Sequence, residues 1–127
     1  MRRLFLASTF VLLTFSGAAL AAPPPMTLEE FVTTANRIPM NPTSLLRSDA
    51  RRLMRESQNA FTAVLEPMRR DMAAGRPTAA CPPEKISVNS GQFLGHLNAI
   101  PAAQRRTMTV ADGVRHWTVA NYPCPRR

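Results

Sequence analysis

The stretch SDARRLMRESQNAFTAVLEPMRRDMAAG, residues 48–75, is the longest periodic segment of this sequence of 127 residues. Apolar or small side chains recur in it at spacings of three and four, which is typical of an amphipathic helix. Gly75, followed by Pro77, favours a helix end. We therefore predict a helix over residues 48–74. Its apolar stripe comprises Ala50, Met54, Ser57, Phe61, Val64, Leu65, Met68 and Met72, and its polar face comprises Arg51, Arg52, Arg55, Asn59, Thr62, Glu66, Arg69 and Arg70.

Pro67 lies inside this pattern and cannot donate a hydrogen bond to the Ala63 carbonyl. We expect it to kink the helix or to split it near Glu66. The methionines of the stripe are more typical of core filling than of a binding groove.

Helices are also predicted on both sides of this segment. Before it, MTLEEFVTTANRIP favours a helix over residues 28–37, with Thr27 and Glu30 as a capping box and Pro39 as the stop. The segment NPTSLL then bridges to the long helix.

After the long helix, the proline-rich residues 76–88 form a connector. Asn89 with Gln92 and Thr109 with Asp112 are the start signals of two further helices. Between them, PAAQRR reads as a short turn. No stretch shows the alternation of apolar and polar residues that is typical of a strand. The sequence therefore predicts an all-α fold, a small bundle of four or five helices.

Cys81 and Cys124 are the two cysteines of the chain. In an oxidising compartment they can form a disulfide, which would close a loop of about 44 residues and stabilise the fold by roughly 4 kcal/mol. The competing interpretations are two unpaired thiols, or a metal or catalytic role. Their spacing is not that of a metal site, so we predict the disulfide.

The first residues, MRRLFLASTFVLLTFSGAALA, have the basic, apolar and small-residue zones of a secretory signal peptide. We predict cleavage after Ala21 and a single domain over residues 22–127, located in the periplasm or secreted. A retained anchor is the alternative, but the apolar run is too short to span a bilayer, and we expect no stable membrane insertion. Loss of Arg2 and Arg3 would lower the net charge from +8 to +6.

Catalytic and metal-binding patterns are lacking in the sequence. His96 and His116 lie on different predicted helices, and no phosphate loop or zinc motif is present. We expect no enzyme activity, cofactor or metal.

Arg47, Arg51 and Arg55 could form a phosphate-binding ridge, but a solvated helix face is the simpler interpretation, with ion pairs such as Arg52 to Glu56. We therefore expect acidic partners but no nucleic acid.

Residues 81–125 resemble the C-terminal half of the Rap/Tai family of type VI secretion immunity proteins. The shared order is Cys-Pro, a loop, a short helix, a proline with a basic turn, and a helix that ends in an aromatic residue and Pro-Cys. The matching positions here are Cys81, Pro82, Leu94, Leu97, Pro101, Arg105, Val110, Val114, Tyr122, Pro123 and Cys124. Residues 26–76 lack the cysteines and the Cys-Gly-Tyr-rich helix that family members often carry there.

The resemblance implies a periplasmic helical protein, often a homodimer, that binds a peptidoglycan amidase toxin delivered by a neighbouring cell and occludes its active site. The turn with Arg105 and Arg106 is our candidate for the partner-binding element, with an ordinary interhelix turn as the alternative. A periplasmic stress chaperone and a cell-envelope binding module remain alternative functions. The chaperone would work by exposing apolar surface at acid pH, and the envelope module rests on the positive charge alone.

Overall fold

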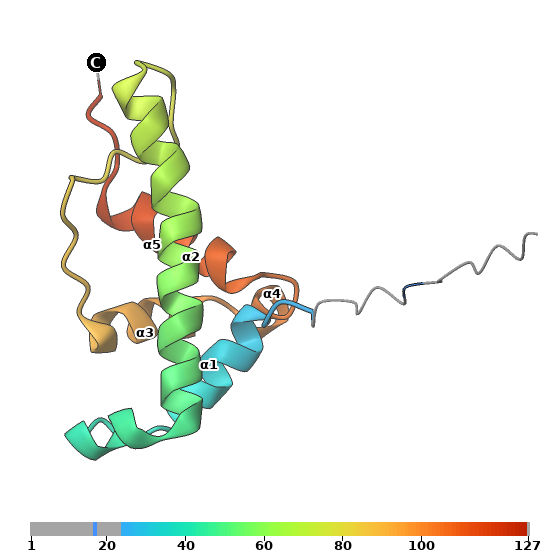
Figure 1. Ribbon diagram of the computed structural model, residues 1–127. Coiled ribbons are helices and arrows are strands. Elements are labelled where there is room, and N and C mark those ends of the chain that lie inside the picture. The colour runs from blue at the N-terminus through green and yellow to red at the C-terminus, as the bar shows by residue number, and fades with distance from the viewer. Residues whose placement is uncertain (1–16, 18–23, 127) are drawn as a thin grey trace, which may run out of the picture.

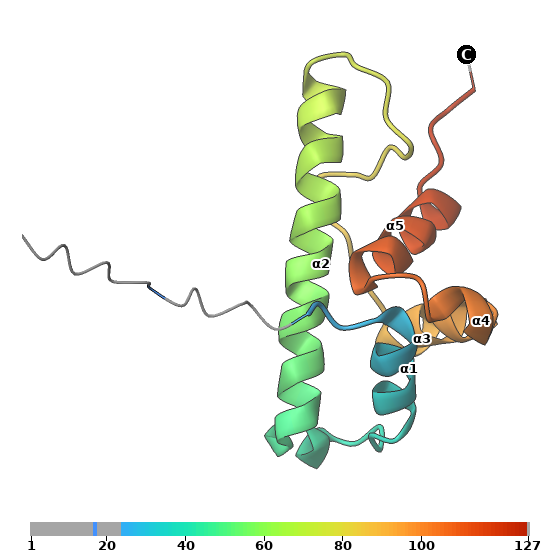
Figure 2. The ribbon, with the colours of Figure 1, turned by 90° about the vertical axis from the view of Figure 1, so that its right-hand side faces the viewer.

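A single long helix, α2 (Ser48–Ala73), runs the length of the molecule in a computed structural model that describes Gly17 and residues 24–126 (Figure 1). The other helices pack to one side of it, as Figure 2 shows. Apart from Gly17, the predicted signal peptide lies outside the described residues, and so does its predicted cleavage after Ala21. None of the described helices is long and apolar enough to cross a membrane.

The all-α prediction is confirmed, because the described residues contain five α-helices and no strand. Four of the helices have nine or more residues, and the turn predicted over PAAQRR contains a fifth, of one turn. A 3-10 helix, which we did not predict, precedes α2. The elements besides α2 are α1 (Leu28–Asn36), η1 (Pro42–Leu46), α3 (Ser90–Ala99), α4 (Ala102–Arg105) and α5 (Val110–Asn121).

Of the two effects expected of Pro67, a kink or a split of the long helix, the split is wrong, because α2 continues through Pro67. Pro67 and Ala63 are both exposed, so the Ala63 carbonyl that loses its helical donor lies on the side of water. The helix ends as predicted. Gly75 adopts the left-handed φ of 69°, and the Arg76 N–H donates to the Asp71 carbonyl at 2.8 Å.

The apolar stripe of α2 is rotated from the predicted one. Leu53 and Ala60, which the prediction left out, are buried. Met54 and Met72, which it included, are exposed by 47% and 39%. The spacing of apolar residues alone does not determine which side of the helix faces the core when further apolar residues lie at the edge of the stripe. The core-filling role predicted for the methionines holds for the buried Met68 alone.

The starts of α1 and α5 lie side by side. Thr27 and Thr109 form an isolated antiparallel bridge, and the Leu28 N–H donates to the Met108 carbonyl at 2.8 Å. Both predicted N-caps are present. The capping box is complete at Thr109, whereas the Glu30 side chain pairs with Arg52 of α2.

Aromatic side chains pack against one another where α2, α3 and α5 meet. Phe61 of α2 contacts Phe93 of α3 and Trp117 of α5, with ring centroids 5.4 and 5.6 Å apart. Trp117 also contacts Phe93 and Tyr122 edge to face, both at 5.7 Å. We call these four residues the aromatic cluster, and it joins three helices that are far apart in sequence.

The connector between α2 and α3 is fixed at several points. The predicted disulfide between Cys81 and Cys124 is present, and the Cys81 N–H donates to the Tyr122 carbonyl at 2.8 Å. Arg69, which we expected on the solvated face, is half-buried and donates to the Glu84 carbonyl at 2.9 Å. The connector is therefore held against both α2 and the end of α5.

We expect the Cys124→Ser variant to be less stable than the parent by about 2–5 kcal/mol, because the unfolded chain loses its cross-link. Urea denaturation of oxidised protein measures the difference. The double variant Cys81→Ser/Cys124→Ser serves as the control and should unfold at the same urea concentration as the single variant. Equal midpoints for parent and Cys124→Ser would contradict the prediction.

Candidate functional site

An apolar groove of about 830 Å³ lies where α1, η1, α2 and α3 meet. Its lining contains no charged side chain, and its volume is within the usual range of ligand pockets. Phe61 and Phe93 of the aromatic cluster lie in this lining. The other lining residues are Phe31, Ala35, Ile38, Pro39, Met40, Asn41, Pro42, Ser44, Leu45, Ala50, Leu53, Met54, Ser57, Gln58, Val88, Ser90 and Leu94.

Large apolar side chains remain exposed around this groove. Met40 is 74% exposed, and Leu45, Met54 and Val88 are also exposed in the lining itself. Leu46, next to Leu45 on η1, is 77% exposed. Scattered exposed apolar residues are ordinary, but four that line one groove are typical of a protein-binding surface.

The segment that carries Met40 and Leu45 is ordered by its own hydrogen bonds. The Asn41 Oδ1 atom accepts from the Ser44 N–H at 3.1 Å and from the Thr43 hydroxyl at 2.6 Å. The buried Ser44 hydroxyl donates to the Pro39 carbonyl. In Figure 1 this teal segment projects from the lower end of the molecule. Its exposed apolar residues are thus presented on a preorganised loop.

The rim of the groove on α2 is positively charged. Arg51 and Arg55 are exposed beside Met54 along the outer flank of the helix, whereas Glu56 lies on its far side. The carboxylate nearest to Arg51 in sequence, that of Asp49, is paired with Arg47, whose hydrogen bond lowers the pKa of Asp49 to about 2.

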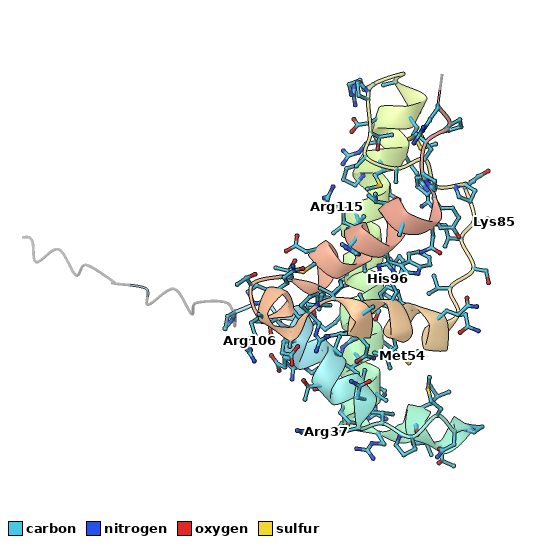
Figure 3. The ribbon with its side chains drawn as sticks, turned by 180° about the vertical axis from the view of Figure 1, so that it is seen from behind. Arg37, Met54, Lys85, His96, Arg106 and Arg115 are labelled. Carbon is cyan, nitrogen blue, oxygen red and sulfur yellow. A yellow bond between two sulfur atoms is a disulfide. The ribbon has the colours of Figure 1, made fainter. Side chains whose placement is uncertain are left out.

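Two further cations lie beyond the groove lining. Arg37 follows α1 directly, and Lys85 precedes Val88 in the connector; Figure 3 labels both, together with Met54. The described residues show no ion pair for Arg37, Arg51, Arg55 or Lys85. An apolar groove with exposed arginines on one flank of α2 favours a partner that is apolar at its centre and acidic at that edge.

The expectation that Arg105 is exposed for a partner is wrong. Its side chain is 12% exposed, and its Nε atom donates to the Glu29 carboxylate at 2.6 Å. Its Nη1 atom donates to the Asn98 and Ile100 carbonyls at 3.1 and 2.6 Å, where α3 ends. A guanidinium satisfies several such carbonyls at once, which a turn pattern in the sequence does not reveal.

The hydrogen bond from Arg105 holds the pKa of Glu29 below its ordinary value, although partial burial of the carboxyl opposes this. The neighbouring Arg106 is exposed and adds a smaller electrostatic effect in the same direction. Of the two predicted partner-binding residues, Arg106 is thus the accessible one. Whether it binds a partner stays a prediction.

The two histidines, which the sequence analysis kept apart, are in contact. The Nε2 atom of His96 on α3 lies 2.7 Å from the Nδ1 atom of His116 on α5. Burial, and secondly the positive charge that His116 can carry, lower the pKa of His96. One imidazole donates the hydrogen bond and the other accepts it, so at most one of the two rings can carry a positive charge while the bond exists.

No group of three or more histidine, cysteine, aspartate or glutamate side chains suited to a metal occurs in the described part of the chain. The two histidines lie on neighbouring predicted helices, so a contact between them could have been suspected. Whether they meet depends on how α3 packs against α5, which the sequence does not give. The groove had one weak signal in the sequence, the run of apolar residues over 38–46 between two predicted helices.

We expect Arg105→Ala to lower the free energy of unfolding by about 1–3 kcal/mol, because the carbonyls at the end of α3 and the Glu29 carboxylate lose their donor. Arg106→Ala is the matched control and should stay within about 0.5 kcal/mol of the parent. Chemical denaturation checks both. If the two variants unfold at the same midpoint, the assigned role of Arg105 is wrong.

A second prediction concerns pH. The pKa of His96 is lower in the folded protein than in the unfolded chain, where it is near 6.5. The stability that the neutral ring contributes is therefore fully present at a pH above 6.5, and it is lost as the pH falls through the pKa of the folded state. We expect the parent to lose more stability than His96→Gln between about pH 7 and pH 5. Urea denaturation in the presence of a chelator measures this, and parallel pH profiles would contradict it.

Known proteins offer no guide to the groove or to the histidine pair. No protein-family model matches this sequence, and comparisons with curated proteins and with solved structures also return no match.

Proposed function

We propose that this protein is an exported immunity protein that binds a peptidoglycan amidase toxin delivered by type VI secretion and occludes the toxin's active site. The resemblance of residues 81–125 to the Rap/Tai family supports this proposal. So does the disulfide, which suits an oxidising compartment such as the periplasm. The observation that carries it is the apolar groove with its arginine rim.

We assign the groove to one occupant, an amphipathic helix of the toxin. The described residues offer no strand edge to which an extended peptide could add, since the pairing of Thr27 with Thr109 is an isolated bridge. An apolar groove between helices can accommodate the apolar face of another helix. Acidic side chains on the flanks of the incoming helix would meet Arg51 and Arg55.

Occlusion requires an element that reaches into or over the toxin's cleft. Residues 39–46 are suited to this, because the loop projects from the body, is ordered by Asn41 and Ser44, and exposes Leu45 and Leu46. A preordered loop loses little conformational entropy on binding. This loop replaces the turn with Arg105 as the proposed inhibitory element, and Arg106 is left as a secondary contact.

We expect Met54→Asp to weaken binding of the toxin at least tenfold, because it places a carboxylate in the apolar groove. Met72→Asp is the matched control. Both methionines are exposed on α2, and 18 residues, about five turns, separate them, so they project from the same side of the helix. Only Met54 lines the groove. Calorimetric titration of the purified amidase into each variant measures the effect.

If both variants bind the toxin as tightly as the parent, the groove is not the toxin site. If the parent itself does not bind or inhibit any amidase delivered by neighbouring cells, the proposed function fails. Client binding that appears only on acidification would favour the chaperone, and retention on anionic vesicles the envelope module.

A competition experiment tests the same proposal in cells. A strain that lacks the gene should be killed by a parental attacker that delivers the toxin. Plasmid copies of the parent and of Met72→Asp should restore survival, whereas Met54→Asp should not. Survival of the strain that lacks the gene would contradict the immunity function.

A further inference from the structure

We propose that His96 and His116 form a binding site for a divalent transition-metal ion, held between α3 and α5. The observation is the approach of two imidazole nitrogens, Nε2 of His96 and Nδ1 of His116, to 2.7 Å across two helices. This site is separate from the apolar groove and does not depend on the proposed function.

The two nitrogens are close to the geometry that a shared metal requires. Bonds of about 2.0–2.1 Å to one ion place two imidazole nitrogens roughly 3 Å apart. The pair thus has to open by less than one ångström. His116 is exposed and can move toward solvent, while His96 is half-buried and fixes the position of the site.

The surroundings leave room for the remaining ligands. A polar pocket of about 390 Å³ opens beside His96, and its lining carries no carboxylate and no cation. His116 does not line this pocket but is exposed, so water molecules can complete the coordination from the solvent side. The residues that line this pocket with His96 are Ser87, Asn89, Gln92, Trp117, Asn121 and Tyr122.

The ligand set selects the class of metal. Two neutral imidazoles favour Cu²⁺, Ni²⁺ and Zn²⁺, with Cu²⁺ bound most tightly, whereas Mg²⁺ and Ca²⁺ need oxygen ligands that are charged or numerous. The described part of the chain has no free cysteine that would compete for the ion. The bound metal would replace the single shared proton with two bonds, and would tie α3 to α5 more firmly.

The chain itself supplies the probe for a test. It has one tryptophan, Trp117, which lines the pocket next to His96, and it has no histidine besides this pair. The mature protein without a histidine tag is titrated with Cu²⁺ and Ni²⁺ while the Trp117 fluorescence is recorded. We expect saturable quenching by both ions, a higher melting temperature in their presence, and no effect of Mg²⁺.

Single variants locate the ligands. His96→Gln and His116→Gln should each weaken the apparent affinity for Cu²⁺ at least tenfold, and Arg115→Gln, which changes the exposed neighbour of His116, should not. Because His116 is exposed, its replacement should leave the fold intact, which the circular dichroism spectrum verifies. Quenching that persists unchanged in both histidine variants, or that does not saturate up to millimolar metal, would overturn the site.

Discussion

The contact of Phe61, Phe93, Trp117 and Tyr122 is the interaction on which the other features depend. It brings α2, α3 and α5 together although these helices are distant in sequence. Its two ends face different surroundings: Phe61 and Phe93 belong to the lining of the apolar groove, and Trp117 and Tyr122 to that of the polar pocket. One packed cluster therefore sets the geometry of both candidate sites.

Helix ends were the part of the fold that the sequence predicted best, because they depend on neighbours within a few residues. The capping box at Thr109, the N-cap at Thr27 and the left-handed Gly75 are all local chemistry. The disulfide was also predictable, since two cysteines allow one pairing. Pro67 misled the prediction, because its cost depends on whether the freed carbonyl can meet water.

Side-chain directions could not be read in the same way. Leu53 and Met54 are adjacent, apolar and both in the groove lining, yet the first is buried and the second is exposed. Arg105 looked like a surface residue until the end of α3 was placed beside it. The contact of His96 with His116 likewise exists only after α3 and α5 pack. These features depend on tertiary contacts that a single sequence does not contain.

The exposure of Met40 and Met54 in the groove has a chemical consequence. A thioether open to solvent is oxidised to the sulfoxide, which turns an apolar contact into a polar one. The buried Met68 is shielded from this reaction. Oxidants would thus make the lining of the groove more polar while they leave the buried core and its cross-link intact, so oxidation would change the chemistry of this surface before it changed the stability of the fold.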